Sequence, residues 1–101
     1  MFTDLSEAVE AVHAGEAILL DVRTHGEHSQ QAAHKSVHLD VNDIQAGHDL
    51  DLDKDTIILV HCRSGGRAGM ACSILETRGY QKVQNVGGLG HWLSAGGKAK
   101  A

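Results

Sequence analysis

The feature that most constrains this chain is an apolar run that stops abruptly at a cysteine. Residues 56–61, Thr-Ile-Ile-Leu-Val-His, have the aliphatic and β-branched character of a strand buried on both faces. Cys62 follows directly, with two glycines soon after it and then a helical pattern. In a strand, tight turn and helix start of this kind, the backbone N–H groups can point inward toward an anion. The sequence therefore predicts an anion-binding loop with a cysteine at its edge.

The residues around Cys62 favour its thiolate form, which is the reactive one. Gly65 and Gly66 adopt positive φ angles freely, as such a turn requires. The helix start adds unpaired N–H groups and the positive end of its dipole. Arg63 and Arg67 add positive charge. A cysteine that only filled a core would need neither the glycines nor the arginines. We therefore interpret Cys62 as an activated nucleophile.

At these positions the chain resembles a known family. Residues 62–67, Cys-Arg-Ser-Gly-Gly-Arg, resemble the active-site loop of rhodanese-type sulfurtransferases, which starts at the nucleophile. Residues 20–23, Leu-Asp-Val-Arg, together with Glu27 resemble the first motif of the family, and residues 87–96 resemble its closing motif. The chain departs from the family at residues 31–36, Gln-Ala-Ala-His-Lys-Ser, where the usual turn reads Gly-His-x-Pro-Gly-Ala.

The resemblance implies a thiosulfate sulfurtransferase that needs no cofactor. The Cys62 thiolate would attack the outer sulfur of thiosulfate or a similar small anionic donor, sulfite would leave, and a persulfide would remain. Cyanide or a cellular thiol would then accept the sulfur. Loop amides would hold the persulfide charge, and Arg63 and Arg67 would attract the donor and stabilise the departing sulfite. The implied site consists of the nucleophile and five substrate-binding residues: Cys62, Arg63, Ser64, Gly65, Gly66 and Arg67.

Two other functions share parts of this pattern. A sulfur-carrier or persulfide-sensing module that acts with a sulfur-relay protein needs the same loop, so the sequence leaves it open. Cysteine-dependent phosphatases and arsenate reductases resemble His-Cys followed by five residues and an arginine. Here four residues separate Cys62 from Arg67, and Ala68 occupies the position of the phosphatase arginine. The shorter loop is narrower, which favours sulfur over a phosphoryl group.

The order of the predicted elements indicates an α/β fold of the rhodanese-like type. We expect one domain over residues 1–101, with a frayed tail from about residue 96. Strands alternating with helices imply a mainly parallel sheet of about five strands with helices on both faces. Ligands bind outside the carboxyl ends of such strands, which is where Cys62 lies. The segments that read as strands are residues 17–22, 36–41, 56–61 and 83–86, of which residues 36–41 alternate apolar and polar side chains.

Composition argues against several classes of function. The net charge is −4 and no basic run is present, so we expect no nucleic-acid binding. No apolar stretch approaches the ~20 residues of a membrane span. The N-terminus lacks the pattern of a signal peptide, and the two cysteines form no disulfide-like framework. These features predict a cytoplasmic protein without a membrane partner.

The histidines invite a metal site, but their surroundings argue against one. His25 with His28, and His34 with His38, have ligand-like spacing. No cysteine or carboxylate set completes a site nearby, so we interpret them as surface histidines and expect no metal. His61 adjoins the nucleophile and could act as a base. Because consecutive strand residues point to opposite faces, we interpret it as structural.

Other residues near the motifs are expected to be structural. Asp21 and Arg23 could pair with each other or with Glu27. Cys72 lies about 7.5 Å along the axis of the helix that begins near Arg67, and Cys62 lies on the far side of the loop. The two cysteines are therefore expected to be too far apart for a disulfide. Trp92 is expected to pack in the core rather than line the pocket.

Overall fold

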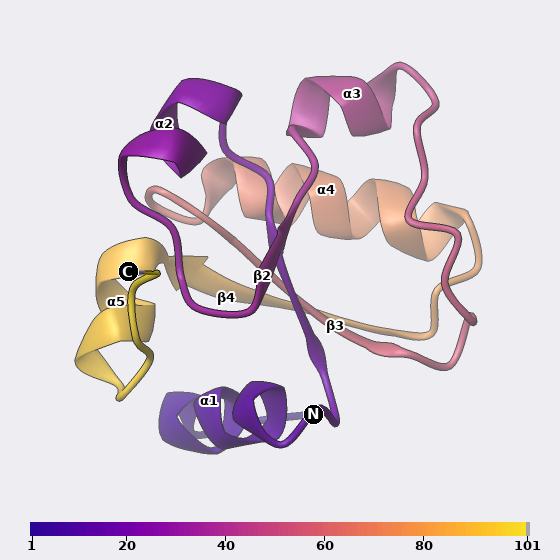
Figure 1. Cartoon of the computed structure of the whole chain (residues 1–101). Coiled ribbons are helices and arrows are strands. Elements are labelled where there is room, and N and C mark those ends of the chain that lie inside the picture. The colour runs from indigo at the N-terminus through magenta and orange to yellow at the C-terminus, as the bar shows by residue number, and fades with distance from the viewer. Residues whose placement is uncertain (101) are drawn as a thin grey trace.

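Helices and strands alternate along almost the whole chain (Figure 1). The computed structural model describes residues 1–100, so Ala101, the last residue of the predicted domain, lies outside the described residues. No helix in this part of the chain is long and apolar enough to cross a membrane. The elements are α1 (Leu5–His13), β1 (Ile18–Asp21), α2 (His25–Gln30), β2 (Ser36–His38), α3 (Val41–Gln45), β3 (Ile57–Cys62), α4 (Gly66–Thr77), β4 (Lys82–Gly88) and α5 (Leu89–Ser94).

The sheet is parallel throughout, with the strand order β2-β1-β3-β4. This confirms the predicted α/β class. The expected number of about five strands is wrong, because the described residues form a four-stranded sheet. The run at residues 36–41 also gives a shorter strand than predicted. Asp40 accepts a hydrogen bond from the backbone N–H of Asn42 and caps α3, so β2 ends at His38.

The buried residues form two cores, one on each face of the sheet. Consecutive residues of β1 and β3 point to opposite faces. Leu20, Ile58 and Val60 pack with α3 and α4, whereas Leu19 and Leu59 pack with α1 and α5. Figure 1 shows α1 on one side of the sheet and α3 and α4 on the other. Helices therefore cover both faces, as predicted.

The C-terminal tail is paired, although the sequence predicted a frayed end. Gly96 has φ +109°, and a Cβ atom on Gly97 would lie 2.3 Å from Cδ1 of Trp92, so the chain turns closely over this side chain. Trp92 itself is 1% exposed, which confirms its place in the core. Beyond the turn, the backbone N–H of Lys100 donates to the carbonyl of Ala32 at 2.8 Å. The two glycines thus bring the tail back onto the residues that follow α2.

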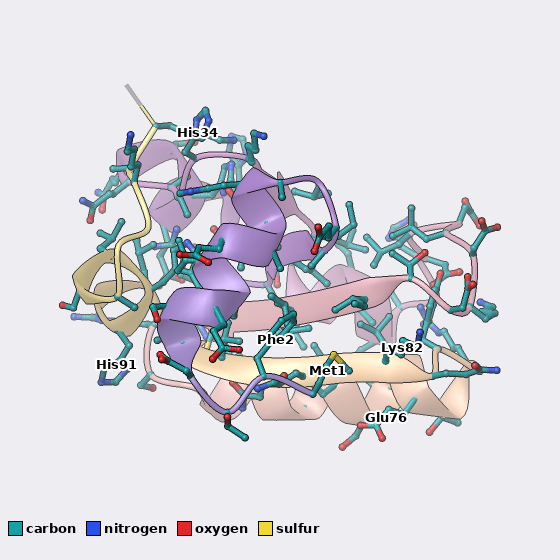
Figure 2. All side chains as sticks on the ribbon, turned by 90° about the horizontal axis from the view of Figure 1, so that it is seen from below. Met1, Phe2, His34, Glu76, Lys82 and His91 are labelled. Atoms are coloured by element: carbon teal, nitrogen blue, oxygen red, sulfur yellow. The ribbon has the colours of Figure 1, made fainter. Side chains whose placement is uncertain are left out.

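The N-terminus is attached to the edge strand β4. The side-chain amide of Gln84 bonds both backbone groups of Phe2, at 3.0 Å from the Phe2 nitrogen and 2.7 Å from its carbonyl oxygen. Figure 2 shows Phe2 lying against β4 beside α1. Gln84 therefore has a structural role at the middle of β4, away from the end of the strand that meets the cysteine.

Candidate active site

Cys62 is the last residue of β3, and β1 and β4 flank this strand on either side. Residues 62–67, called the Cys62 loop below, lead from β3 into α4. Gly65 occupies the position before α4 and has φ +103°, in the left-handed region. This is where the turn needs a glycine. Gly66 starts the helix and, unlike Gly65, has no positive φ angle.

The backbone of this loop surrounds the sulfur atom. The N–H of Gly65 donates to Cys62 Sγ at 2.9 Å. Cys62 is 1% exposed, and this burial on its own would raise the pKa of its thiol. The backbone N–H groups of Ala68, Ser64, Gly65 and Arg67 outweigh burial, so the pKa of Cys62 lies below its ordinary value. The loop therefore favours a thiolate, as the sequence predicted.

The end of β4 packs closely against the loop. Gly88 pairs with Cys62 across the sheet. A Cβ atom on Gly88 would lie only 2.3 Å from the carbonyl oxygen of Arg63, a distance that no side chain tolerates. Gly88 therefore allows the two backbones to meet. Through this residue, the closing sequence motif packs directly against the Cys62 loop.

Glu27 holds the far end of the Cys62 loop. Its two carboxylate oxygens accept from Arg67 Nη1 at 2.7 Å and Nη2 at 3.0 Å. The Arg67 guanidinium, helped by Thr24, lowers the pKa of Glu27 to about 2. Thr24 and Glu27 also form a capping box at the start of α2, which fixes the carboxylate in place. Of the two alternatives that the sequence left open for Asp21 and Arg23, the pairing with Glu27 does not form, because the Glu27 carboxylate binds Arg67 instead.

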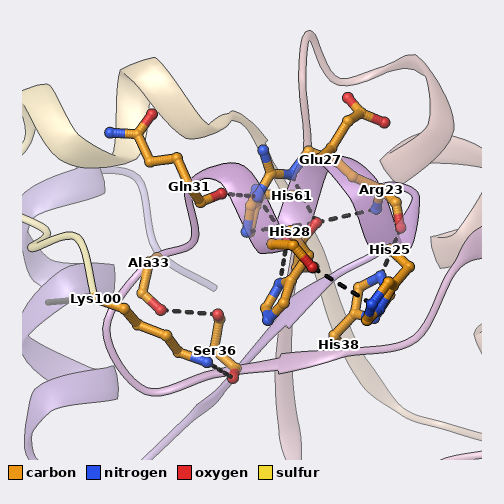
Figure 3. A network of polar contacts seen from close by, with 12 residues as sticks. Arg23, His25, Glu27, His28, Gln31, Ala33, Ser36, His38, His61 and Lys100 are labelled. Atoms are coloured by element: carbon orange, nitrogen blue, oxygen red, sulfur yellow. Dashed lines mark hydrogen bonds and ion pairs between the residues drawn. The ribbon is translucent and has the colours of Figure 1, made fainter.

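Asp21 and Arg23 form a buried ion pair. Figure 3 shows Arg23 among the polar side chains of the surrounding network. Arg23 Nε donates to Asp21 Oδ1 at 2.9 Å, and Nη2 donates to Oδ2 at 2.7 Å. Burial would raise the pKa of Asp21, but hydrogen bonds from Arg23 and His28 hold it far below its usual range. Arg23 Nη2 also donates to the carbonyl of Gln31 at 2.6 Å. The predicted pairing of Asp21 with Arg23 is confirmed, and the pair anchors the end of α2.

Two of the histidines predicted to lie on the surface are part of this network. His28 Nδ1 lies 2.8 Å from Asp21 Oδ2, and His38 Nε2 lies 2.7 Å from the carbonyl oxygen of Arg23. The rings of His28 and His38 stack with their centroids 4.6 Å apart. Among the described residues, no group of three or more histidine, cysteine or carboxylate side chains is arranged to hold a metal ion. These imidazoles connect α2 to β2.

His61 lies within the sheet, and its ring contacts Asp21 and the protein backbone. It is fully buried, with Nδ1 at 3.3 Å from the Cys62 carbonyl oxygen and Nε2 at 3.9 Å from Asp21 Oδ1. Burial is the main cause that lowers the pKa of His61 below its ordinary value. A neutral imidazole with these contacts agrees with the structural interpretation.

A pocket of about 340 Å³ opens beside the Cys62 loop. Most of its charged groups are already paired: Arg23 with Asp21, and Glu27 with Arg67. Arg63 is exposed, and no ion pair joins it to another described residue. The lining residues come from α2, the Cys62 loop and α5 and are Arg23, Glu27, Gln30, Gln31, Arg63, Leu89, Gly90 and Leu93.

The sequence did not single out the walls of this pocket. Gln30 and Gln31 end a polar helix that has no apolar stripe, and nothing in their pattern indicates a ligand. Leu89 and Leu93 lie in α5, and the sequence assigns neither of them to a site. Leu89 is buried, but α5 also presents both leucines to the pocket. The position of α5 relative to α2 is a property of the fold that no local pattern encodes.

Known proteins share this sequence and architecture. The family model described as "Rhodanese-like domain" matches residues 4–95. A Bacillus subtilis relative, YtwF, is named as a candidate sulfurtransferase; it is 34% identical over 87% of this chain and 82% of its own length. A longer protein of Ogataea parapolymorpha, the adenylyltransferase and sulfurtransferase uba4, is 33% identical over 84% of this chain but only 22% of its own length.

A solved structure shows the same fold. The human single-domain sulfurtransferase TSTD1 superposes with a TM-score of 0.80, over 91% of this chain and 94% of that one, at 19% identity. This likeness concerns the fold, whereas the family model and the Bacillus relative concern the sequence itself. The family model and the Bacillus relative show that the chain belongs to the rhodanese-like domain family.

Proposed function

We propose that this chain is a sulfurtransferase that moves sulfane sulfur from thiosulfate, or a similar small anionic donor, to cyanide or a thiol through a persulfide on Cys62. One observation carries the proposal: the Gly65 N–H lies 2.9 Å from Cys62 Sγ in a loop whose amides lower the pKa of the thiol. Membership of the family supports sulfur transfer in general. The donor, the acceptor and the persulfide are our proposals.

The chemistry consists of two displacements at sulfur. The Cys62 thiolate attacks the outer sulfur of thiosulfate, a new S–S bond forms, and the old S–S bond breaks with its electron pair leaving on sulfite. The product is a Cys62 persulfide anion. A nucleophilic acceptor then attacks the outer sulfur, and the electron pair of the broken bond returns to Cys62 as a thiolate. No net oxidation or reduction of the protein occurs, so the cycle needs no cofactor.

The loop supplies the electrostatic stabilisation for both steps. The amides of Ser64, Gly65 and Arg67 already face the sulfur, and their N–H groups would hold the charge of the persulfide. Arg63 is the exposed cation at the pocket and would attract the donor and the departing sulfite. Arg67 carries its charge beside the loop but shares it with Glu27. We therefore assign more of the donor binding to Arg63 than to Arg67.

A second candidate is a sulfur carrier that receives its sulfur from a protein partner and turns over poorly alone. The relative from Ogataea parapolymorpha favours it, because there a matching segment is part of a longer protein whose name joins adenylyltransferase and sulfurtransferase activities. Such a carrier would use the same Cys62 chemistry.

Both cysteines are free in the structure, which supports the cytoplasmic location that we propose for either function.

Turnover by the purified protein separates these candidates. Thiosulfate and cyanide would be supplied together and thiocyanate would be measured, with Cys62→Ser as the control. Many turnovers by the wild type and none by the variant support the enzyme. A single transferred sulfur per chain supports the carrier. Thiocyanate formation by Cys62→Ser would contradict both candidates, and hydrolysis of an aryl phosphate would revive the phosphatase alternative.

A further inference from the structure

The side chain of Asn85 connects the end of β4 to the Cys62 loop. Its Nδ2 donates to the carbonyl oxygen of Gly65 at 2.9 Å, and its Oδ1 accepts from the backbone N–H of Gly87 at 2.8 Å. Gly65 is also the residue whose N–H donates to Cys62 Sγ. One amide side chain therefore holds the carbonyl of the residue whose N–H contacts the sulfur.

Two glycines lie beside this amide. A Cβ atom on Gly69 would lie 3.6 Å from Asn85 Nδ2, and one on Gly65 would lie 3.9 Å from both Nδ2 and Oδ1. Asn85 thus packs against two glycines, one before α4 and one in its first turn. Asn85 is exposed, so its two hydrogen bonds, rather than this packing, hold the amide in the orientation in which it reaches the Gly65 carbonyl.

The strand carrying Asn85 is irregular at this point. Val60 pairs with Asn85, whereas His61 pairs with Gly87, so Val86 is an extra residue in β4. Such bulges redirect a strand and are common beside active sites. The side chain of Asn85 accepts the N–H of Gly87, which stabilises the bulge and with it the close approach of the following glycine to the loop.

From these contacts we propose that Asn85 is a positioning residue for Cys62. By holding the Gly65 carbonyl on one side and the bulge on the other, it keeps the Gly65 N–H directed at the sulfur. It touches neither the sulfur nor the pocket. The Gly65 N–H would stabilise the negative charge of a Cys62 thiolate and of a Cys62 persulfide in the same way. The importance of Asn85 for sulfur transfer therefore rests on the proposed function, whereas its effect on the pKa of the thiol does not.

Gln84 offers a matched control on the same strand. It too is an amide that bridges β4 to a distant backbone, but its partner is Phe2. We would compare Asn85→Ala with Gln84→Ala, both in a Cys72→Ala background so that Cys62 is the one thiol. The readout is the rate of Cys62 alkylation by iodoacetamide across pH, on protein whose folding is checked by thermal denaturation.

We expect Asn85→Ala to move the alkylation profile to higher pH. Below the inflection, alkylation should be about two- to tenfold slower than in the parent, the range expected for loss of one neutral hydrogen bond. Gln84→Ala should lower the melting temperature and leave the profile unchanged. An unshifted Asn85→Ala profile, or an equal shift in Gln84→Ala, would overturn the inference.

A second variant covers the case in which Asn85→Ala does not fold. Asn85→Asp keeps the acceptor for the Gly87 N–H but cannot donate to the Gly65 carbonyl, so it should also shift the profile, and an unchanged profile refutes the role. The alkylation of Asn85→Asp would be measured at high salt, which screens the negative charge that the aspartate adds. Alkylation requires no sulfur transfer. A shift without persulfide formation in the wild type would therefore retain the role of Asn85 and reject the proposed donor.

Discussion

Glu27 on α2 and Arg67 in the Cys62 loop are joined by two hydrogen bonds, at 2.7 and 3.0 Å, across 40 positions of sequence. This pair changes the interpretation of the second loop arginine. On the sequence alone, Arg67 was expected mainly to attract the donor. In the structure a carboxylate balances its charge and ties the start of α4 to α2, so Arg67 also fixes the shape of the loop.

A double-mutant cycle tests this role of Arg67. Glu27→Gln and Arg67→Ala should each lower kcat/KM for thiosulfate, because each removes the ion pair that holds the Cys62 loop against α2. Both side chains are about one-third exposed or less, so each change should lower the free energy of unfolding by only about 0.5–1 kcal/mol. The double variant should lose little more than either single one. Fully additive losses in kcat/KM would show that the two residues act independently.

Arg63 should account for most of the attraction of the anionic donor. It is the exposed cation of the pocket, so Arg63→Ala should raise the KM for thiosulfate and weaken its dependence on salt. The matched control is Lys82→Ala, which removes an exposed cation at the start of β4, the end of this strand that lies away from the Cys62 loop. Steady-state kinetics at two ionic strengths measure both effects. Equal changes in the two variants would contradict a specific role for Arg63.

His61 should make the fold sensitive to mild acid. Burial keeps its pKa below the ordinary value of 6.5, whereas in the unfolded chain it binds a proton near that value. The unfolded state then binds more protons, so the free energy of unfolding falls as the pH drops below about 6.5. Denaturant titrations between pH 8 and pH 5 (approximately) test this, and His61→Asn should flatten the dependence.

The control for this prediction is His48→Asn, which changes an exposed histidine in the connection between α3 and β3. This variant should keep the slope of the wild type. If His61→Asn has the same slope as the wild type, then His61 is not the group that makes the fold acid-sensitive.

Gly88 should be intolerant of any side chain. A Cβ atom there would lie 2.3 Å from the Arg63 carbonyl oxygen, so Gly88→Ala must displace the loop or β4. We expect a loss of about 1–3 kcal/mol in unfolding free energy together with a large loss of sulfur transfer. Gly26→Ala is the matched control, since a Cβ atom there meets only Thr24 Oγ1, at an ordinary contact distance of 4.0 Å, and Gly26 does not line the pocket. Thermal denaturation and activity of the two variants decide the point; similar behaviour would contradict the close approach.

The sequence predicts those parts of the site that are contiguous in the chain. Strand, glycine turn and helix follow one another at Cys62, so local chemistry was enough to identify the loop and the glycine at Gly65. The partners of the loop come from elsewhere. Glu27 reaches Arg67 only because parallel strands bring both to the same edge of the sheet, and Asn85 reaches Gly65 only through a bulge in β4.

The same limit explains the errors in the predicted fold. The tail reads as unstructured because its residues are glycine, lysine and alanine, yet the surface of Trp92 and the backbone of Ala32 provide its contacts. His28 and His38 read as surface residues because their spacing says nothing of the buried carboxylate of Asp21 between α2 and β2. Such contacts depend on how elements pack, which local periodicity does not describe.

A persulfide on Cys62 can be detected from the intact mass of the protein after incubation with excess thiosulfate, beside a Cys62→Ser control. We expect the wild type to gain one sulfur atom, which cyanide removes, and the variant to gain none. An unchanged mass in the wild type would contradict thiosulfate as the donor. A gain of sulfur in Cys62→Ser would contradict Cys62 as the residue that carries it.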